Sequence, residues 1–147
     1  MKKVLISALV LLTVLALGCS YNNSNQEPWE IYSHASMGGV DGKPDFQEYK
    51  YQIVMTYTGK HELEAYNSII IKSENFKGLV IEGEETETWV PSTKSVKIEG
   101  KMVLDTRGLN KQKILEMGPV ITGVSIKWSA KGESFTETKT LQPSQFN

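Results

Sequence analysis

The chain has 147 residues, one cysteine, 39% hydrophobic residues, and 16 Lys and Arg against 17 Asp and Glu. This length favours a single domain, and the nearly balanced charge argues against nucleic-acid binding, which requires concentrated Lys and Arg. Because one cysteine cannot form a disulfide within the chain, apolar burial has to hold the fold together.

The N-terminus has the layout of an export signal. Lys2 and Lys3 precede an apolar run from Val4 to Leu17. This run is shorter than the roughly 20 residues of a membrane-spanning helix, and it fits the apolar part of a cleavable signal. We therefore predict a signal peptide over residues 1–18. The predicted location is the extracytoplasmic side of the cell membrane, with secretion as the alternative.

Residues 15–19 (Leu-Ala-Leu-Gly-Cys) resemble the lipobox of bacterial lipoproteins. The resemblance implies that the Cys19 thiol receives a diacylglyceryl group and that Cys19 becomes the new N-terminus. Ala16 departs from the pattern, because the family prefers Leu or a branched side chain three residues before the cysteine. The alternative is an ordinary signal cut after Gly18, which would leave an exposed thiol on a secreted protein. Two acyl chains suffice for stable anchoring, so the membrane is the expected partner of Cys19.

A polar segment follows the signal. Residues 20–28 are poor in aliphatic side chains, which is typical of a flexible tether. Treated as a random coil, the segment spans roughly 15–18 Å. We predict a lipid-anchored tether over residues 19–28 and a β-sandwich domain over residues 29–147.

Apolar and polar residues alternate through most of this domain, which is typical of β-strands with one buried face. The alternation is clearest over residues 49–57, 96–104 and 122–130. Weaker patterns predict further strands over residues 29–37, 68–73, 79–84, 87–90 and 134–141.

Turn and helix signals connect these strands. Residues 130–133 (Ala-Lys-Gly-Glu) predict a short turn and a closing hairpin. The glycines and the proline of residues 38–45 predict a longer loop without regular structure. Residues 109–117 break the alternation between Asn110, a helix-capping residue type, and Gly118-Pro119, so they predict a short helical crossover.

Seven or eight short strands with one helical crossover favour an all-β fold, built as a two-layer sandwich. A helical turn before the penultimate strand, followed by a closing hairpin, resembles the crossover and the last hairpin of immunoglobulin-like domains. The cysteine pair of antibody domains is absent from the chain. A small β-barrel is the alternative fold, and neither fold implies a function.

The sequence contains no pattern that indicates a cofactor or a metal. His34 and His61 are the only histidines, and they lack the spacing of metal ligands. The chain also lacks Gly-x-Ser-x-Gly and Ser-x-x-Lys, so no activated serine is indicated. We therefore predict a protein that binds no cofactor and is not an enzyme.

Two glycine-containing segments are candidates for presenting a binding surface. Asp41 and Asp45 lie within residues 38–45, and His61 lies within residues 59–65. These segments interrupt the strand pattern, and surface loops carry binding residues more often than regular elements do. We take Asp41, Asp45 and His61 as candidate interaction residues.

Trp89 is the remaining candidate for an interaction surface. It follows the acidic run of residues 82–87 and precedes Val90-Pro91, where a strand is expected to end. An exposed Trp at such an edge would anchor a partner, because aromatic residues dominate interface hot spots. The alternative is half-buried packing of the indole. For the acidic run, we predict a solvated edge strand that charge protects from aggregation.

Together these features predict an exported, membrane-anchored lipoprotein of the bacterial envelope that acts as a non-catalytic binding or interaction module. The expected partner is an envelope protein or a cell-wall ligand. The alternative is a metal-binding carrier or a small hydrolase that uses Asp41, Asp45, Glu62 and the two histidines.

Overall fold

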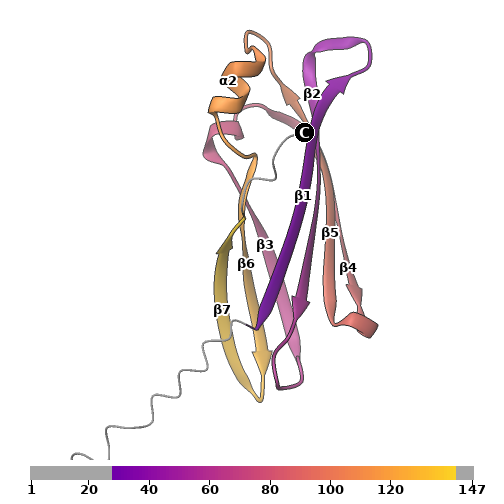
Figure 1. Ribbon diagram of the computed structural model, residues 1–147, viewed down its shortest axis with the longest axis vertical. Coiled ribbons are helices and arrows are strands. Elements are labelled where there is room, and N and C mark those ends of the chain that lie inside the picture. The colour runs from indigo at the N-terminus through magenta and orange to yellow at the C-terminus, as the bar shows by residue number, and fades with distance from the viewer. Residues whose placement is uncertain (1–27, 142–147) are drawn as a thin grey trace, which may run out of the picture.

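A computed structural model describes residues 28–141, so the predicted signal peptide, Cys19 and all of the predicted tether except Pro28 lie outside the described residues. The described chain folds into two antiparallel sheets (Figure 1). The first sheet has the order β1-β2-β5-β4 and the second has the order β3-β6-β7. The strands are β1 (Trp29–Val40), β2 (Lys43–Tyr57), β3 (Ala65–Lys72), β4 (Val80–Val90), β5 (Ser95–Asp105), β6 (Ile121–Ala130) and β7 (Glu133–Thr140). The helices are the 3₁₀ turns η1 (Glu74–Phe76) and η2 (Pro91–Thr93), and the α-helix α2 (Lys111–Glu116).

The order of the strands confirms the sandwich. A constant-type immunoglobulin domain has the strand order A-B-E-D in one sheet and C-F-G in the other. Here the seven strands, taken in chain order, occupy the same positions. Both sheets end in strands with only one neighbour within the described residues, so the sheets do not close into one another. The small-barrel alternative is therefore wrong.

Burial follows the predicted alternation in β2, β5 and β6. The inward side chains of these strands form the core, and most of their neighbours in sequence are half-buried or exposed; Val103 of β5 is an exception, since it is buried between Met102 and Leu104. Because each of these strands has one face against the opposite sheet, a period of two is the expected pattern. The core residues of the three strands include Tyr49, Tyr51, Ile53, Met55, Tyr57, Val96, Ile98, Met102, Leu104, Val124, Ile126 and Trp128.

An aromatic cluster joins the two sheets at the end where β1 begins. Trp29 of β1 is 1% exposed, and its ring lies 5.2 Å from that of Tyr57. It also meets Trp128 of β6 edge-on at 6.2 Å and Tyr66 of β3 edge-on at 6.5 Å, both ring-centre distances. Such pairs add about 0.5–1.5 kcal/mol each beyond the area they bury. The cluster therefore links the sheets without a disulfide.

The expectation of an irregular loop over residues 38–45 is wrong. β1 continues to Val40 and β2 begins at Lys43, so only a two-residue turn separates them. The ladder shifts register between Gly39 and Val40, where a bulge absorbs the irregularity. Pairing of β2 with β5 begins only at Phe46, so Pro44 lies in a two-stranded ribbon where its missing N–H is tolerated.

The expectation of separate strands over 79–84 and 87–90 is also wrong. β4 runs without interruption from Val80 to Val90 and pairs with β5 along this length. Its only irregularity is a register shift between Val80 and Glu82. Acidic residues interrupt the apolar pattern that predicts a strand. On an edge strand, however, their side chains can extend into solvent while the backbone stays paired with the neighbouring strand.

The predicted helix and closing hairpin are both confirmed. The Asn110 side chain caps α2 by accepting a hydrogen bond from the Lys113 N–H at 2.9 Å, and Gly118 follows the helix with φ +80°. β6 and β7 form a hairpin whose turn residues, Lys131 and Gly132, have φ of 54° and 73°. Two consecutive residues with positive φ are the requirement of a tight hairpin turn of this kind.

Candidate functional site

The four sequence candidates lie at opposite ends of the sandwich. Asp41 is in the β1–β2 turn and Asp45 is near the start of β2, whereas His61 follows the end of β2. Roughly 40 Å of extended strand separates Asp45 from Tyr57, the last residue of β2. Trp89 lies close to the end of β4 and opposite Val96, which also pairs with Met55 near the end of β2, so Trp89 is at the same end as His61. The structure therefore does not bring the four residues together.

The same separation applies to the alternative based on metal binding or hydrolysis. Asp41 and Asp45 stand at one end, and His61 and Glu62 stand at the other. His34 lies mid-strand in β1, paired with Gln52. Between residues 28 and 141, no group of three or more His, Cys, Asp or Glu side chains is placed to hold a metal ion.

Asp45 has a structural contact at its own end of the sandwich. Its carbonyl oxygen accepts hydrogen bonds from the Thr106 N–H at 2.8 Å and from the Thr106 hydroxyl at 3.0 Å. These bonds tie the start of β2 to the end of β5. The hydrogen bonds and charge of Asp105, together with the charge of Asp45, raise the pKa of Arg107.

Trp89 packs at the open edge between the two sheets. Its position on β4 is opposite Val96, and the side chain packs against the core. Its ring centre lies 5.4 Å from that of Tyr66 on β3, with the planes 33° apart. The indole thus contacts the edge strands of both sheets. This is the half-buried packing that was the alternative to an exposed anchor for a partner.

The acidic run forms a solvated edge strand, as predicted, and the alternation of β4 divides its carboxylates. Glu84 faces outward, where its Oε1 forms an ion pair with Lys101 Nζ at 3.0 Å. Glu85 and Glu87 face the second sheet. Glu87 Oε2 accepts a hydrogen bond from the Ser68 hydroxyl at 2.6 Å.

Glu85 and Glu87 also contact tyrosines. Glu85 accepts a hydrogen bond from the Tyr51 hydroxyl. Burial, followed by the hydrogen bond and charge of Glu85, raises the pKa of Tyr51. Burial and the charge of Glu87 raise the pKa of Tyr66. Both phenols therefore stay protonated, and the carboxylates next to them remain available as acceptors on the open edge.

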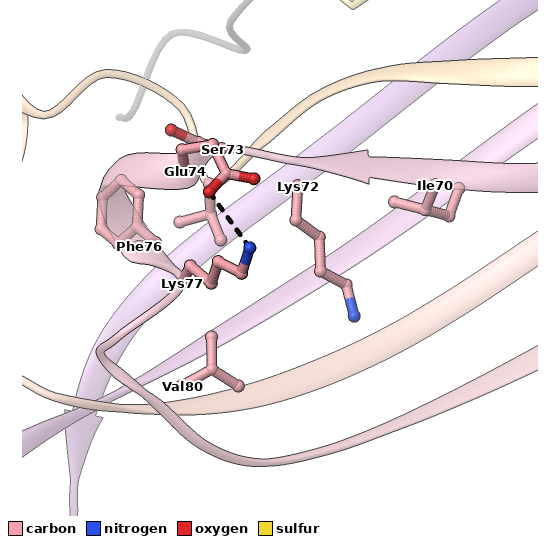
Figure 2. A pocket seen from close by; sticks show the side chains of 8 residues that line it. Ile70, Lys72, Ser73, Glu74, Phe76, Lys77 and Val80 are labelled. Carbon is pink, nitrogen blue, oxygen red and sulfur yellow. Dashed lines mark hydrogen bonds and ion pairs between the residues drawn. The ribbon is translucent and has the colours of Figure 1, made fainter.

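A pocket lies at the other end of the same edge, where β3 passes through η1 into β4. It has a volume of about 380 Å³ and is lined by Ile70, Lys72, Ser73, Glu74, Phe76, Lys77, Val80 and Val120 (Figure 2). Phe76 and Val120 are each 1% exposed and supply apolar surface together with the half-buried Ile70 and Val80.

Two lysines stand at the rim of this pocket. Lys77 Nζ contacts Glu74 Oε2 at 3.3 Å, and Figure 2 draws this pair with the Lys72 side chain beside it. Within the described part of the chain, Lys72 forms no ion pair. An apolar pocket of this size with ammonium groups at its rim suits a small ligand that has an apolar part and an anionic group.

Local hydrogen bonds fix the wall of the pocket. The Ser73 hydroxyl caps η1 by accepting a bond from the Asn75 N–H at 3.3 Å. Asn75 Nδ2 donates to the Met117 carbonyl at 2.9 Å, which joins η1 to the end of α2. The single aromatic residue of η1, Phe76, is buried and lines the pocket together with Val120. Seven of the eight lining residues lie within residues 70–80, and Val120 adds to the wall from a distant part of the chain. The sequence contains no motif for this pocket, because its shape depends on where the fold places residues 70–80 relative to Val120.

No protein-family model matches the chain, and comparison with curated proteins and with solved structures found no match. Over residues 28–141, no helix has the length and apolar composition to span a membrane. The geometry of the chain's own residues is therefore the basis for the functional proposal.

Proposed function

We propose that the chain is a lipid-anchored binding module of the bacterial cell envelope, without catalytic activity, held at the outer face of a membrane through Cys19. The lysines, apolar run and lipobox-like residues 15–19 support export and acylation. The polar residues 20–28 support a tether between the anchor and the domain.

One observation carries this proposal: β1 begins at the end of the sandwich opposite to η1, which follows β3 (Figure 1). η1 supplies Glu74 and Phe76 to the pocket. The Thr58 N–H donates to the Pro28 carbonyl at 2.7 Å, which holds the start of β1 beside the end of β2. β1 has 12 residues, and a strand of this length extends roughly 40 Å. A domain anchored through this end would direct the pocket and the β1–β2 turn away from the membrane.

The pocket beside η1 is the binding site that this geometry favours. Its position far from the anchor suits a ligand of the cell wall or of another envelope protein. Lys72, which forms no ion pair within residues 28–141, favours a carboxylate or a phosphate, whereas Lys77 is already paired with Glu74 at the same rim. The apolar wall around Phe76 favours an aliphatic or aromatic group. The Ser73 hydroxyl serves as a helix cap, so the pocket offers complementarity rather than an activated nucleophile.

Metabolic labelling with a fatty-acid analogue tests the anchor. We expect wild type to incorporate the label and to fractionate with membranes, whereas Cys19→Ala remains unlabelled and leaves the membrane fraction. A wild-type chain without label, or equal labelling of both chains, would show that the cysteine is not the lipid acceptor.

Energy transfer to a dye in the membrane tests the orientation. Because Cys19 is the only cysteine, acylation leaves an introduced thiol as the single site for a fluorophore. Lys131→Cys places it in the β6–β7 turn at the anchor end, and Leu115→Cys places it on exposed α2 at the other end. We expect strong transfer from position 131 and weak transfer from position 115. Equal transfer would contradict the proposed orientation.

A further inference from the structure

The free edge of β3 differs from the other three edges of the sandwich. β4 carries four glutamates, β7 carries Glu133, Glu137 and Lys139, and β1 carries Glu30 and a bulge. In contrast, β3 is uncharged from Ala65 to Ile71 and contains three consecutive isoleucines. Ile69 is 61% exposed. A long, uncharged edge strand without proline is a template for the addition of another strand.

We propose that this edge binds an extended, basic peptide segment of a partner protein, which adds a fourth strand to the β3-β6-β7 sheet. The inference goes beyond the pocket proposed above by naming a second surface and its class of partner. Lipid attachment enters only one of the two arguments against a second copy, and the peptide assay below does not depend on it. Within the described residues, β3 pairs only with β6, so its other side has backbone donors and acceptors available for a partner.

The charge of the partner follows from β4. Glu87 faces β3, Glu85 lies on the same face of β4 beside Tyr51, and neither carboxylate forms an ion pair within residues 28–141. Glu87 reaches the Ser68 hydroxyl at 2.6 Å. A residue opposite Ser68 on an added strand would have its Cβ about 5 Å from that of Ser68, and a Lys or Arg side chain there would reach Glu87.

The alternation of the added strand follows from the same register. On the added strand, a side chain beside Ser68 would face the first sheet and the Glu87 carboxylate. A side chain beside Ile69 would lie on the outer face, next to that exposed isoleucine. The partner segment therefore alternates basic with aliphatic residues. Lys72 ends the edge, so the basic residues belong beside Tyr66 and Ser68 rather than at the end of β3.

A second copy of the chain fits this edge less well. Antiparallel pairing of two β3 strands about a twofold axis would place the two Trp29 ends at opposite ends of the dimer. One Trp29 would then stand roughly 40 Å farther from the membrane, beyond the roughly 15–18 Å that the tether spans. The acidic β4 strands of the two copies would also approach each other.

Peptide binding to the full chain carrying Cys19→Ala tests the proposal. The probe is the acetylated and amidated peptide Lys-Val-Lys-Val-Lys-Val-Lys. Lys-Lys-Val-Val-Lys-Lys-Val has the same composition without the alternation, and a version of the probe N-methylated along both edges cannot pair with a strand. We expect the alternating peptide to bind about tenfold more tightly than either control, and to slow hydrogen exchange of the β3 amides.

Two variants test the position of the peptide. Glu87→Gln should weaken binding about fivefold, since it removes a charge that faces the added strand. Glu84→Gln, whose carboxylate faces the outer side with Lys101, is the matched control and should leave affinity unchanged. Circular dichroism verifies that both variants fold.

Three results would overturn the proposal. One is equal affinity for the alternating and scrambled peptides, which would mean attraction by charge alone. A second is an equal effect of the two glutamine variants. The third is sedimentation of the peptide-free chain as a dimer with protected β3 amides, which would identify a second copy as the occupant. None of these results changes the outcome of fatty-acid labelling at Cys19, so the labelling tests the anchor independently of the peptide.

Discussion

Replacing Gly100 with Ala should destabilise the sandwich, because the ring of Tyr51 occupies the space that the new methyl group needs. A Cβ built on Gly100 would overlap with Cζ, Oη and Cε1 of Tyr51. The ring cannot swing away freely, since Tyr51 is only 6% exposed and its hydroxyl donates to Glu85. Gly100 pairs with Tyr51 on one side and with Glu85 on the other, so a shift of the ring disturbs both contacts.

The expected cost is that of overpacking a core, about 1–3 kcal/mol of the free energy of unfolding. For a domain of this size, 1 kcal/mol corresponds to a change in Tm of about 4 °C. Urea and thermal unfolding followed by circular dichroism measure both quantities. Gly38→Ala is the matched control. Gly38 lies in β1, and apart from its chain neighbours no heavy atom lies within 4 Å of the place that a Cβ would take, so alanine there should stabilise by up to about 1 kcal/mol.

A double-mutant cycle tests the cause. Tyr51→Leu removes the overlapping ring, so it should cost at least about 1 kcal/mol less in the Gly100→Ala background than in wild type. An equal cost of Tyr51→Leu in both backgrounds would mean that the ring of Tyr51 is not what opposes the alanine at position 100. Equal shifts of the urea midpoint in the same direction by Gly100→Ala and Gly38→Ala would also contradict an overlap at position 100.

Three further predictions concern stability. Trp29→Ala should cost about 3–5 kcal/mol by urea unfolding, because it removes the ring that contacts both sheets; Trp29→Phe should restore most of the loss. Burial raises the pKa of Tyr49 to about 12 and also raises that of Tyr51, so the folded state keeps protons that the unfolded state releases. Stability should therefore be complete below about pH 10 and fall as the pH rises toward about 12, and unfolding free energies measured in this interval should fall less steeply for Tyr51→Phe. Asn110→Ala should cost about 0.5–2 kcal/mol through loss of the α2 cap, whereas Asn110→Ser should retain the cap and keep Tm near that of wild type.

The central strands are predictable from sequence because their information is local. From Tyr49 to Tyr57, successive side chains point alternately toward the opposite sheet and toward solvent. Their burial therefore alternates with the period of the strand. The turn at Lys131-Gly132 and the cap at Asn110 are equally local, since each depends on a few neighbouring residues.

The edges of the sheets are less predictable, because residue preferences change there. Pro44 would interrupt a central strand, but β5 does not pair with β2 at that position. In sequence, Gly83 and the glutamates of β4 resemble a break in a strand. At a sheet edge the side chains can stay in solvent, so the strand continues through them. Which strand lies at an edge follows from the topology of the whole domain and cannot be obtained from one segment.

The candidate site depends on contacts between distant segments. Phe76 is an isolated aromatic residue in a polar turn, and only the fold, which brings Val120 to the same pocket, makes it part of a pocket wall. Glu87 is one of several glutamates in sequence, and its orientation toward Ser68 follows from the packing of two sheets. The sequence indicates that β4 is acidic, whereas the fold determines which carboxylates face β3.

The pocket and the edge of β3 form two parts of one surface, and their opposite charges give that surface a direction. Along β3, the Glu87 carboxylate faces the strand near Ser68. The ammonium groups of Lys72 and Lys77 lie where the strand ends, and only Lys77 is paired there, with Glu74, so one positive charge remains. A bound segment that runs parallel to β3 would place its basic side chains beside Glu87 and its own C-terminal carboxylate beside the lysines. A segment in the reverse direction would bring an N-terminal ammonium group to the same lysines, where like charges repel. The charge distribution therefore favours a parallel orientation for a peptide that ends at the pocket.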